Sequence, residues 1–204
     1  MPVTLSSQDL VAVSAVPTRE ELLDKLPRGG TGPRIVVIGG DAALAAVLTH
    51  LMRHERLDVE LAFVPESRTP ACKIYRLDHG SKAAKRALDG EARATPLIRD
   101  DLGVALVGSA VLSGPDGGKL TGETYVDNFQ LFTGIGPGVE IRPLAKAPGL
   151  EAARVGGLRR KWARGRAAQT GAVSARLVRD GILERKQLKR STFYRDANDW
   201  LLVR

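Results

Sequence analysis

The sequence predicts an α/β fold in two parts: an α/β domain with a mostly parallel sheet in residues 1–99, and a small β-rich, sandwich-like domain in residues 100–204. Residues 34–99 alternate short apolar runs with Ala/Leu-rich helical segments, the order typical of parallel strands joined by crossover helices. From about residue 102 onward, short apolar runs follow one another with glycine-rich turns between them, which indicates a sandwich or barrel of short strands.

The beginning of the chain carries few structural signals. Residues 10–16 are predicted as a strand. Thr18 then precedes a short helical segment that ends near Leu26, with Glu21 at the capping-box position. Residues 27–33, Pro-Arg-Gly-Gly-Thr-Gly-Pro, predict a loop.

Residues 34–52, RIVVIGGDAALAAVLTHLM, contain the strongest pattern in the chain. Residues 35–38 predict a buried strand, and Gly39 and Gly40 permit a tight turn after it. From Asp41 onward the apolar residues have helical spacing. Such a corner presents backbone N–H groups and a helix N-terminus, where phosphates bind. The pattern also fits an ordinary corner in which Asp41 caps the helix, so both interpretations stay open.

Later segments complete the predicted elements. Residues 35–38, 61–64 and 94–98 are expected to be neighbouring strands of one largely parallel sheet. In the second part, Asp180 and Gly181 give a two-residue hairpin signal. Strands are predicted there at residues 125–132, 139–144, 172–179, 187–194 and 200–203.

Residues 34–52 resemble the glycine-rich signature of the diacylglycerol kinase and NAD kinase superfamily, a strand that runs into Gly-Gly-Asp-Gly-Thr and then a helix. Gly39, Gly40 and Asp41 match, whereas Ala42 and Ala43 replace the last Gly and Thr. The family's next landmark is a strand that ends in Pro before a Gly-Thr-Gly-Asn-Asp loop. Residues 61–65 are similar to that strand, but residues 66–71 read Glu-Ser-Arg-Thr-Pro-Ala.

The resemblance extends to other parts of the chain. Residues 83–98 look like the family's helix and the strand that closes its nucleotide domain, and residues 165–204 are similar to the last strands of bacterial lipid kinases. The chain therefore resembles a divergent member of the lipid kinase (NAD kinase-like) superfamily, with a nucleotide-type first domain.

The resemblance also implies functional residues. Asp41 would be the catalytic carboxylate beside the transferred phosphate, and a helix N-terminus would lower its pKa and keep it ionised. Gly39, Gly40, Asp41, Arg68 and Thr69 would contact the phosphates of a nucleotide. An active enzyme would use ATP and Mg²⁺, although no metal ligands can be named.

The altered loop argues against efficient phosphoryl transfer, which depends on positioning and charge stabilisation of the phosphates. Residues 66–71 contain no glycine to let the backbone approach oxygen, and Glu66 adds a negative charge that Arg68 only partly offsets. We therefore expect a catalytically impaired lipid-kinase-like protein that binds an anionic ligand, a membrane surface or a partner. The alternative is an active ATP-dependent diacylglycerol kinase, a phosphotransferase, with an unorthodox phosphate loop.

Positive charge is concentrated in the last quarter of the chain. Residues 154–204 hold 14 Lys/Arg against 4 Asp/Glu, a balance of +10, whereas residues 1–153 hold 17 against 19, a balance of −2. The densest cluster surrounds Trp162 and is predicted to bind anionic surfaces: Arg159, Arg160, Lys161, Arg164 and Arg166. Anionic phospholipid or a lipid substrate is the expected partner, and a solvated basic face with no partner is the alternative.

Composition and short sequence patterns limit the possible functions and locations of the protein. Aromatic residues make up 4% of the chain, which argues against stacking platforms for nucleic acid. No apolar run reaches the roughly 18 residues that span a bilayer, and residues 1–10 lack the basic start and apolar core of a signal peptide. Cys72 is the only cysteine. These features favour a cytoplasmic protein, peripheral at the inner face of the membrane, and indicate no oligomeric state.

Overall fold

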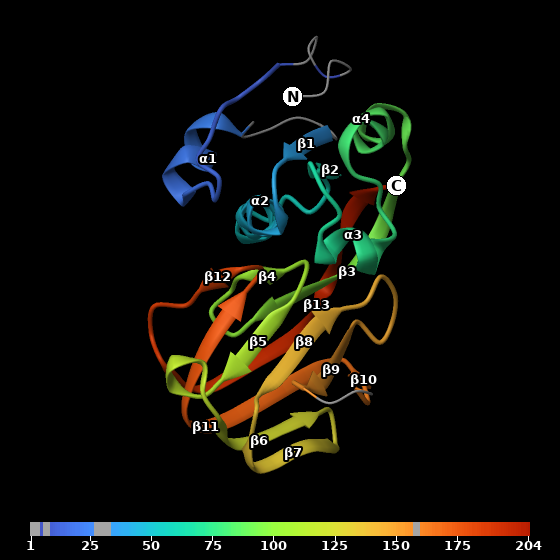
Figure 1. Cartoon of the computed structure of the whole chain (residues 1–204). Helices are drawn as coiled ribbons and strands as arrows, with labels where there is room; N and C mark the ends of the chain where they lie inside the picture. Colours follow the sequence, from blue (N-terminus) through green and yellow to red (C-terminus); the bar gives the residue numbers. More distant parts are fainter. Residues whose placement is uncertain (1–4, 6–8, 27–33, 157–159) are drawn as a thin grey trace. The chain divides into compact units, whose positions relative to one another are not determined.

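The computed structural model describes residues 5, 9–26, 34–156 and 160–204, and the chain divides into two units (Figure 1). The first unit comprises Met1–Thr95 and Asn198–Arg204, and the second comprises Pro96–Ala197. The sequence-based division fell between residues 99 and 100 and assigned the end of the chain to the second domain. The end of the last strand belongs instead to the first unit, because it pairs with a strand there.

Helices and strands alternate in the first unit. Their bounds are α1 (Arg19–Lys25), β1 (Arg34–Ile38), α2 (Asp41–Arg53), β2 (Glu60–Val64), α3 (Pro70–Tyr75), α4 (Gly80–Asp89) and β3 (Ala92–Asp100), which continues into the second unit. Thr18 caps α1 in a capping box with Glu21, as the sequence predicts. The strand predicted at residues 10–16 is absent, because these exposed residues have no neighbouring strand to pair with.

The sheet of the first unit is mostly parallel. β1 pairs with β2 in parallel, with Val37 opposite Phe63. The end of β13 (Leu188–Val203) also pairs with β2 in parallel, with Leu202 opposite Leu61. β3 pairs with β13 rather than with β2, so the expectation that residues 94–98 lie next to residues 61–64 is wrong. The end of β13 lies between them, and Leu202 there is fully buried.

Small residues let the helices of the first unit lie close to its sheet. Ala83, Ala84 and Ala87 of α4 are buried in one cluster with Ala62 and Val64 of β2. Trp200 of β13 is also buried, and its ring lies nearly perpendicular to the Tyr75 ring with centroids 5.7 Å apart. None of the described helices is long and apolar enough to cross a membrane.

The second unit is a set of antiparallel strands. Its elements are β4 (Ala105–Leu106), β5 (Ala110–Ser113), the 3₁₀ turn η2 (Pro115–Gly117), β6 (Leu120–Val126), β7 (Phe129–Gly136), β8 (Val139–Pro143), β9 (Leu150–Arg154), β10 (Ala163–Gly165), β11 (Ala167–Arg179), β12 (Ile182–Leu183) and most of β13. The long strand β11 joins two sheets. Its first half pairs with β6 and β13, and its second half pairs with β5 and β12. Side chains from both sheets, including those of Phe193, Leu112 and Ile141, share one buried core.

Some strand bounds differ from those predicted. Residues 125–132 contain the β6–β7 turn rather than a strand, because Asp127 adopts a φ of +48° and accepts hydrogen bonds from the Arg166 and Ala167 amides. The strands predicted at residues 187–194 and 200–203 form the single strand β13. The turn at Asp180 and Gly181 is confirmed: both have positive φ, and Arg179 pairs with Ile182 across it.

Candidate functional site

The Gly39–Gly40 corner joins β1 to the start of α2 and is hydrogen-bonded to the end of β2. The Gly39 amide donates a 3.3 Å hydrogen bond to the Val64 carbonyl, and its φ of +156° is one that other residues rarely adopt. Gly40 is the N-cap of α2 and is exposed, and a Cβ added there would meet no atom within 4 Å. The backbone therefore requires glycine at residue 39, while Gly40 leaves open space in front of the helix N-terminus.

The Asp41 carboxylate accepts a hydrogen bond from a neighbouring helix, and it does not cap its own. Its Oδ2 accepts a 3.0 Å hydrogen bond from the Ala71 amide in the first turn of α3, and the residue is 8% exposed. α2 has no side-chain cap. The interpretation of Asp41 as the N-cap of α2 is therefore wrong, because its carboxylate ties the start of α2 to the start of α3 instead.

Burial raises the pKa of the Asp41 carboxyl above its usual range. The Thr69 hydroxyl and the Ala71 amide act in the opposite direction, because hydrogen bonds to a carboxylate favour its charged form, but they do not outweigh the desolvation. This result reverses the expectation of a lowered pKa. The charged form of Asp41 is held at a cost in free energy rather than stabilised by the helix terminus.

Asp41→Asn is expected to stabilise the protein at pH 7 by about 0.5–2 kcal/mol. The pKa of Asp41 is higher in the folded state than in the unfolded state. The stability that its carboxyl group contributes is therefore present below the unfolded pKa and is lost as pH rises through the folded pKa. At pH 7 the asparagine avoids burying a charge, and its amide oxygen still accepts from the Ala71 amide. Urea unfolding at pH 7 and pH 4 measures the difference, which should shrink at the lower pH. An Asp41→Asn variant less stable than wild type at pH 7 would contradict this prediction. The control is Asp89→Asn, because Asp89 is exposed.

The loop after β2 reaches the same corner through Thr69. The Thr69 hydroxyl caps α3 by accepting from the Cys72 amide at 3.3 Å, and Pro70 is the first residue of that helix. Arg68 is exposed and forms no hydrogen bond or ion pair with the described residues. The structure thus brings Gly40, Asp41 and Thr69 together. Sequence reasoning missed Ala71, whose contribution is a backbone amide that no residue pattern reveals.

The predicted basic cluster lies in the second unit, and its members differ in their pairing. Arg159 lies outside the described residues. Arg160 forms an ion pair with Glu140, and Arg164 pairs with Glu151 at 3.2 Å. Lys161 is exposed and forms no ion pair with the described acidic residues. Arg166 is also exposed, and its backbone amide donates to the Asp127 carboxylate.

A pocket of about 870 Å³ lies within this cluster, and we call it the basic pocket. Among the described residues, cations and apolar groups line it, and no Asp or Glu does. The principal lining residues are Arg154, Arg160, Lys161, Arg164, Phe129, Leu131, Trp162 and Ala163. Its size is within the range of pockets that hold small molecules.

Trp162 is held in the basic pocket by an arginine of β8. The Arg142 guanidinium lies 3.5 Å from the centroid of the Trp162 ring, a cation–π contact. Arg142 also pairs with Glu151 at 2.8 Å, and Glu151 is shared with Arg164. Arg142 was missed by sequence reasoning, since it is far from the cluster along the chain and lies beside it only through strand pairing.

No group of three or more His, Cys, Asp or Glu within the described ranges is placed to hold a metal ion. No family model and no curated protein matches the chain. Solved structures do match it. A putative diacylglycerol kinase from Bacillus anthracis str. Sterne has a TM-score of 0.67 at 10% identity, covering 83% of this chain and 75% of that one.

A second similar structure is an NAD kinase from Archaeoglobus fulgidus in complex with ATP. Its TM-score is 0.59 at 13% identity, covering 84% of this chain and 77% of that one. These similarities confirm the predicted fold: the chain has the diacylglycerol kinase and NAD kinase-like fold.

Proposed function

We propose that this chain is a catalytically impaired protein with a lipid-kinase-like fold that binds anionic phospholipid surfaces through the basic pocket and its surroundings. It would act as a cytoplasmic protein, peripheral at the inner face of a membrane. The observation that carries the proposal is the excess of positive charge around a pocket with an apolar lining. Five cations, Arg142, Arg154, Arg160, Lys161 and Arg164, face two carboxylates, Glu140 and Glu151, an excess of three positive charges.

The geometry near Gly40 supports impaired catalysis. Asp41 is buried and bonded to the Ala71 amide, and burial disfavours its charged form, so its carboxylate is poorly suited to hold Mg²⁺ beside a phosphate. The Thr69 hydroxyl already caps α3, and residues 66–71 offer no glycine backbone to phosphate oxygens. These residues fit Mg²⁺-ATP poorly.

The distribution of cations supports attraction to an anionic surface. Glu140 and Glu151 are already paired, and both are largely buried beside their arginines. Lys161 and Arg154 are exposed and have no carboxylate partner in the described part of the chain. Each Lys or Arg near an anionic bilayer adds about 1 kcal/mol of attraction.

Vesicle co-sedimentation tests the proposal. Wild type is expected to pellet with vesicles that contain phosphatidylserine and not with pure phosphatidylcholine, and pelleting should fade as salt rises. Arg154→Gln combined with Lys161→Gln should weaken binding by about 10- to 30-fold, because two attractive charges are lost without stranding a carboxylate.

The matched control is Lys186→Gln combined with Lys189→Gln, two exposed lysines of the second unit that do not line the basic pocket. It should bind as wild type does. An equal loss in both double variants, or no pelleting of wild type at low salt, would contradict the proposal. A duplex-DNA competitor measures any general affinity for polyanions.

The second candidate is an active ATP-dependent diacylglycerol kinase that uses ATP and Mg²⁺. The open space in front of Gly40 at the start of α2 favours it, since a helix N-terminus suits a phosphate. A similar structure, the NAD kinase, was solved in complex with ATP.

Calorimetry with ATP and Mg²⁺ separates the two candidates. We expect no binding tighter than about 1 mM in wild type, because the loop after β2 lacks a glycine cradle. Micromolar affinity that Asp41→Asn abolishes would instead support the kinase.

A further inference from the structure

We infer that the basic pocket binds one anionic lipid molecule, with its phosphate against the cations at the rim and one acyl chain along the apolar lining. This inference rests on the proposed membrane function and goes beyond it, because attraction to a charged surface needs no pocket. The ligand it names is a single anionic amphiphile.

The lining of the basic pocket combines apolar and cationic residues. Leu131, Val155 and Ala163 are apolar, and Phe129 stands 61% exposed at the pocket. Burial of such apolar surface by a hydrocarbon chain is favourable because it removes that surface from water. Four cations line the same pocket, so the group that the hydrocarbon carries must be anionic.

The cations at the pocket differ in their availability for a phosphate. Arg160 and Arg164 are held by Glu140 and Glu151, and neither carboxylate lines the pocket. Lys161 is exposed, and Arg154 lies with its guanidinium 5.4 Å from the centroid of the Phe132 ring. Lys161 and Arg154 therefore remain to bind a phosphate.

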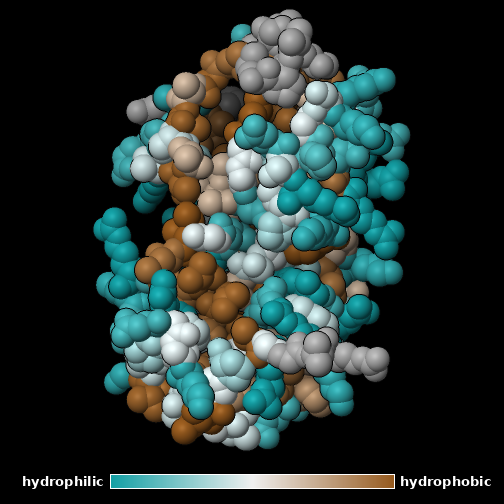
Figure 2. Space-filling model, viewed as in Figure 1, coloured by the Kyte–Doolittle hydropathy of each residue, from teal (hydrophilic) through white to brown (hydrophobic). Residues whose placement is uncertain are grey.

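The hairpin that contributes Phe129 carries a second exposed apolar residue. Ile135 of β7 is 68% exposed, and β7 pairs only with β6 among the described strands. Figure 2 shows hydrophobic residues among hydrophilic ones at the lower end of the view, where Figure 1 places the β6–β7 hairpin. Apolar side chains beside cations suit the boundary between headgroups and acyl chains, where a lipid can pass into the pocket.

A series of alkyl phosphates tests the inference on the wild-type protein. Hexyl, octyl and decyl phosphate, each below its critical micelle concentration, are titrated by calorimetry. Affinity should rise by up to about fourfold per added methylene group, the factor for full burial. Inorganic phosphate and the neutral octanol should bind at least tenfold more weakly than octyl phosphate.

A pocket-filling variant tests the location. Ala163→Phe adds a ring in the pocket and leaves every charge in place, and it should weaken decyl phosphate binding at least tenfold. Ala197→Phe, at an exposed residue of β13, is the matched control and should bind as wild type does. Thermal unfolding checks that both variants fold, and the wild-type series decides the question if Ala163→Phe does not.

The outcomes separate this inference from the proposed function. Equal affinity for all alkyl chain lengths, with vesicle binding intact, would contradict binding of an acyl chain in the pocket. The proposed attraction to anionic membranes would then still hold. Equal affinity for octanol and octyl phosphate would overturn the anionic ligand. Loss of vesicle binding with the chain-length dependence intact would overturn the proposed function alone.

Discussion

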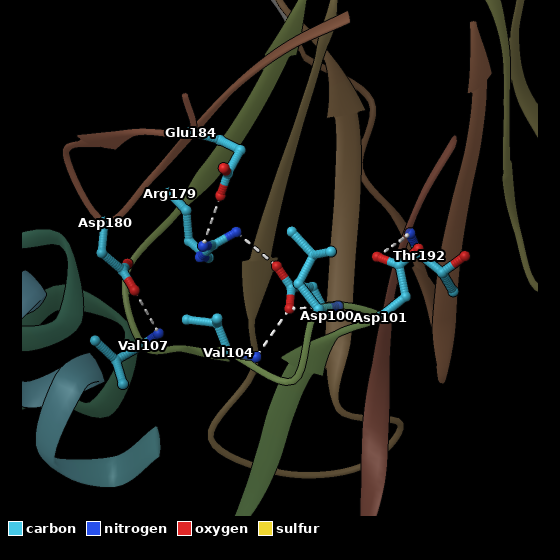
Figure 3. Close-up of polar contacts among 9 residues, drawn as sticks. Asp100, Asp101, Val104, Val107, Arg179, Asp180, Glu184 and Thr192 are labelled. Atoms are coloured by element: carbon cyan, nitrogen blue, oxygen red, sulfur yellow. Dashed lines mark hydrogen bonds and ion pairs between the residues drawn. The ribbon is translucent and has the colours of Figure 1, made fainter. Parts of the chain in front are cut away.

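Asp100→Ala is expected to destabilise the protein by about 3–5 kcal/mol, the cost of breaking a buried ion pair. Asp100 is fully buried, and its Oδ2 accepts from Arg179 Nη1 at 2.5 Å. Its Oδ1 accepts from the Leu102 and Val104 amides at 3.1 and 2.9 Å, and Figure 3 shows this carboxylate between the loop and the arginine. Alanine would leave Arg179 with one carboxylate partner among the described residues, Glu184 at 3.5 Å.

Urea unfolding of a set of variants measures this effect. Arg179→Met combined with Asp100→Ala should lose less stability than the two single losses added together, since no buried charge is then left without its partner. Glu184→Ala, which removes the longer contact, should cost about 1 kcal/mol or less. A loss below 1 kcal/mol in Asp100→Ala would show that the ion pair contributes little.

Asp180→Ala is expected to cost about 3 kcal/mol and to lower the melting temperature by about 6–12 °C. The Asp180 carboxylate accepts from three successive amides, those of Val107, Gly108 and Ser109, at 3.1, 2.7 and 3.0 Å. Figure 3 shows the bond to Val107. Asp180 also has a φ of +49°, which alanine adopts less readily than Asp or Asn.

Asp180→Asn is the matched variant for this prediction. It keeps the preference for positive φ and one acceptor oxygen, so we expect about half of the loss. Differential scanning calorimetry of the two variants beside wild type gives both values. Equal losses would assign the whole effect to the carboxylate charge, and no loss in either would contradict the prediction.

Local features of the fold were predictable because their determinants are neighbours in the sequence. The capping box of Thr18 and Glu21 spans a single helical turn, and the Asp180–Gly181 turn needs only two residues that accept positive φ. The corner at Gly39 likewise depends on one residue and the apolar strand before it. The stereochemistry of each of these features depends only on the residues within it, so each can be predicted without knowledge of the rest of the chain.

Pairing between distant segments was not predictable. The end of β13 pairs with β2, and so the strand at residues 94–98 was assigned the wrong neighbour. A run of apolar residues predicts that a strand is buried, but it does not predict which other strand will pair with it. The hydrogen-bond partner of Asp41 was not predictable for the same reason. It is the backbone amide of Ala71, and residue types do not indicate which backbone amide a carboxylate will contact.

The fold class, the glycine corner and the concentration of positive charge in the last quarter of the chain follow from composition and short-range periodicity, which can be read without coordinates. What those cations surround depends on which strands pair. Strand pairing brings Arg142 onto the Trp162 ring, and Phe129 and Lys161, which are far apart in the sequence, line the same pocket. The tertiary structure also buries Asp41 and raises its pKa, because desolvation depends on the atoms that the fold packs around a carboxylate.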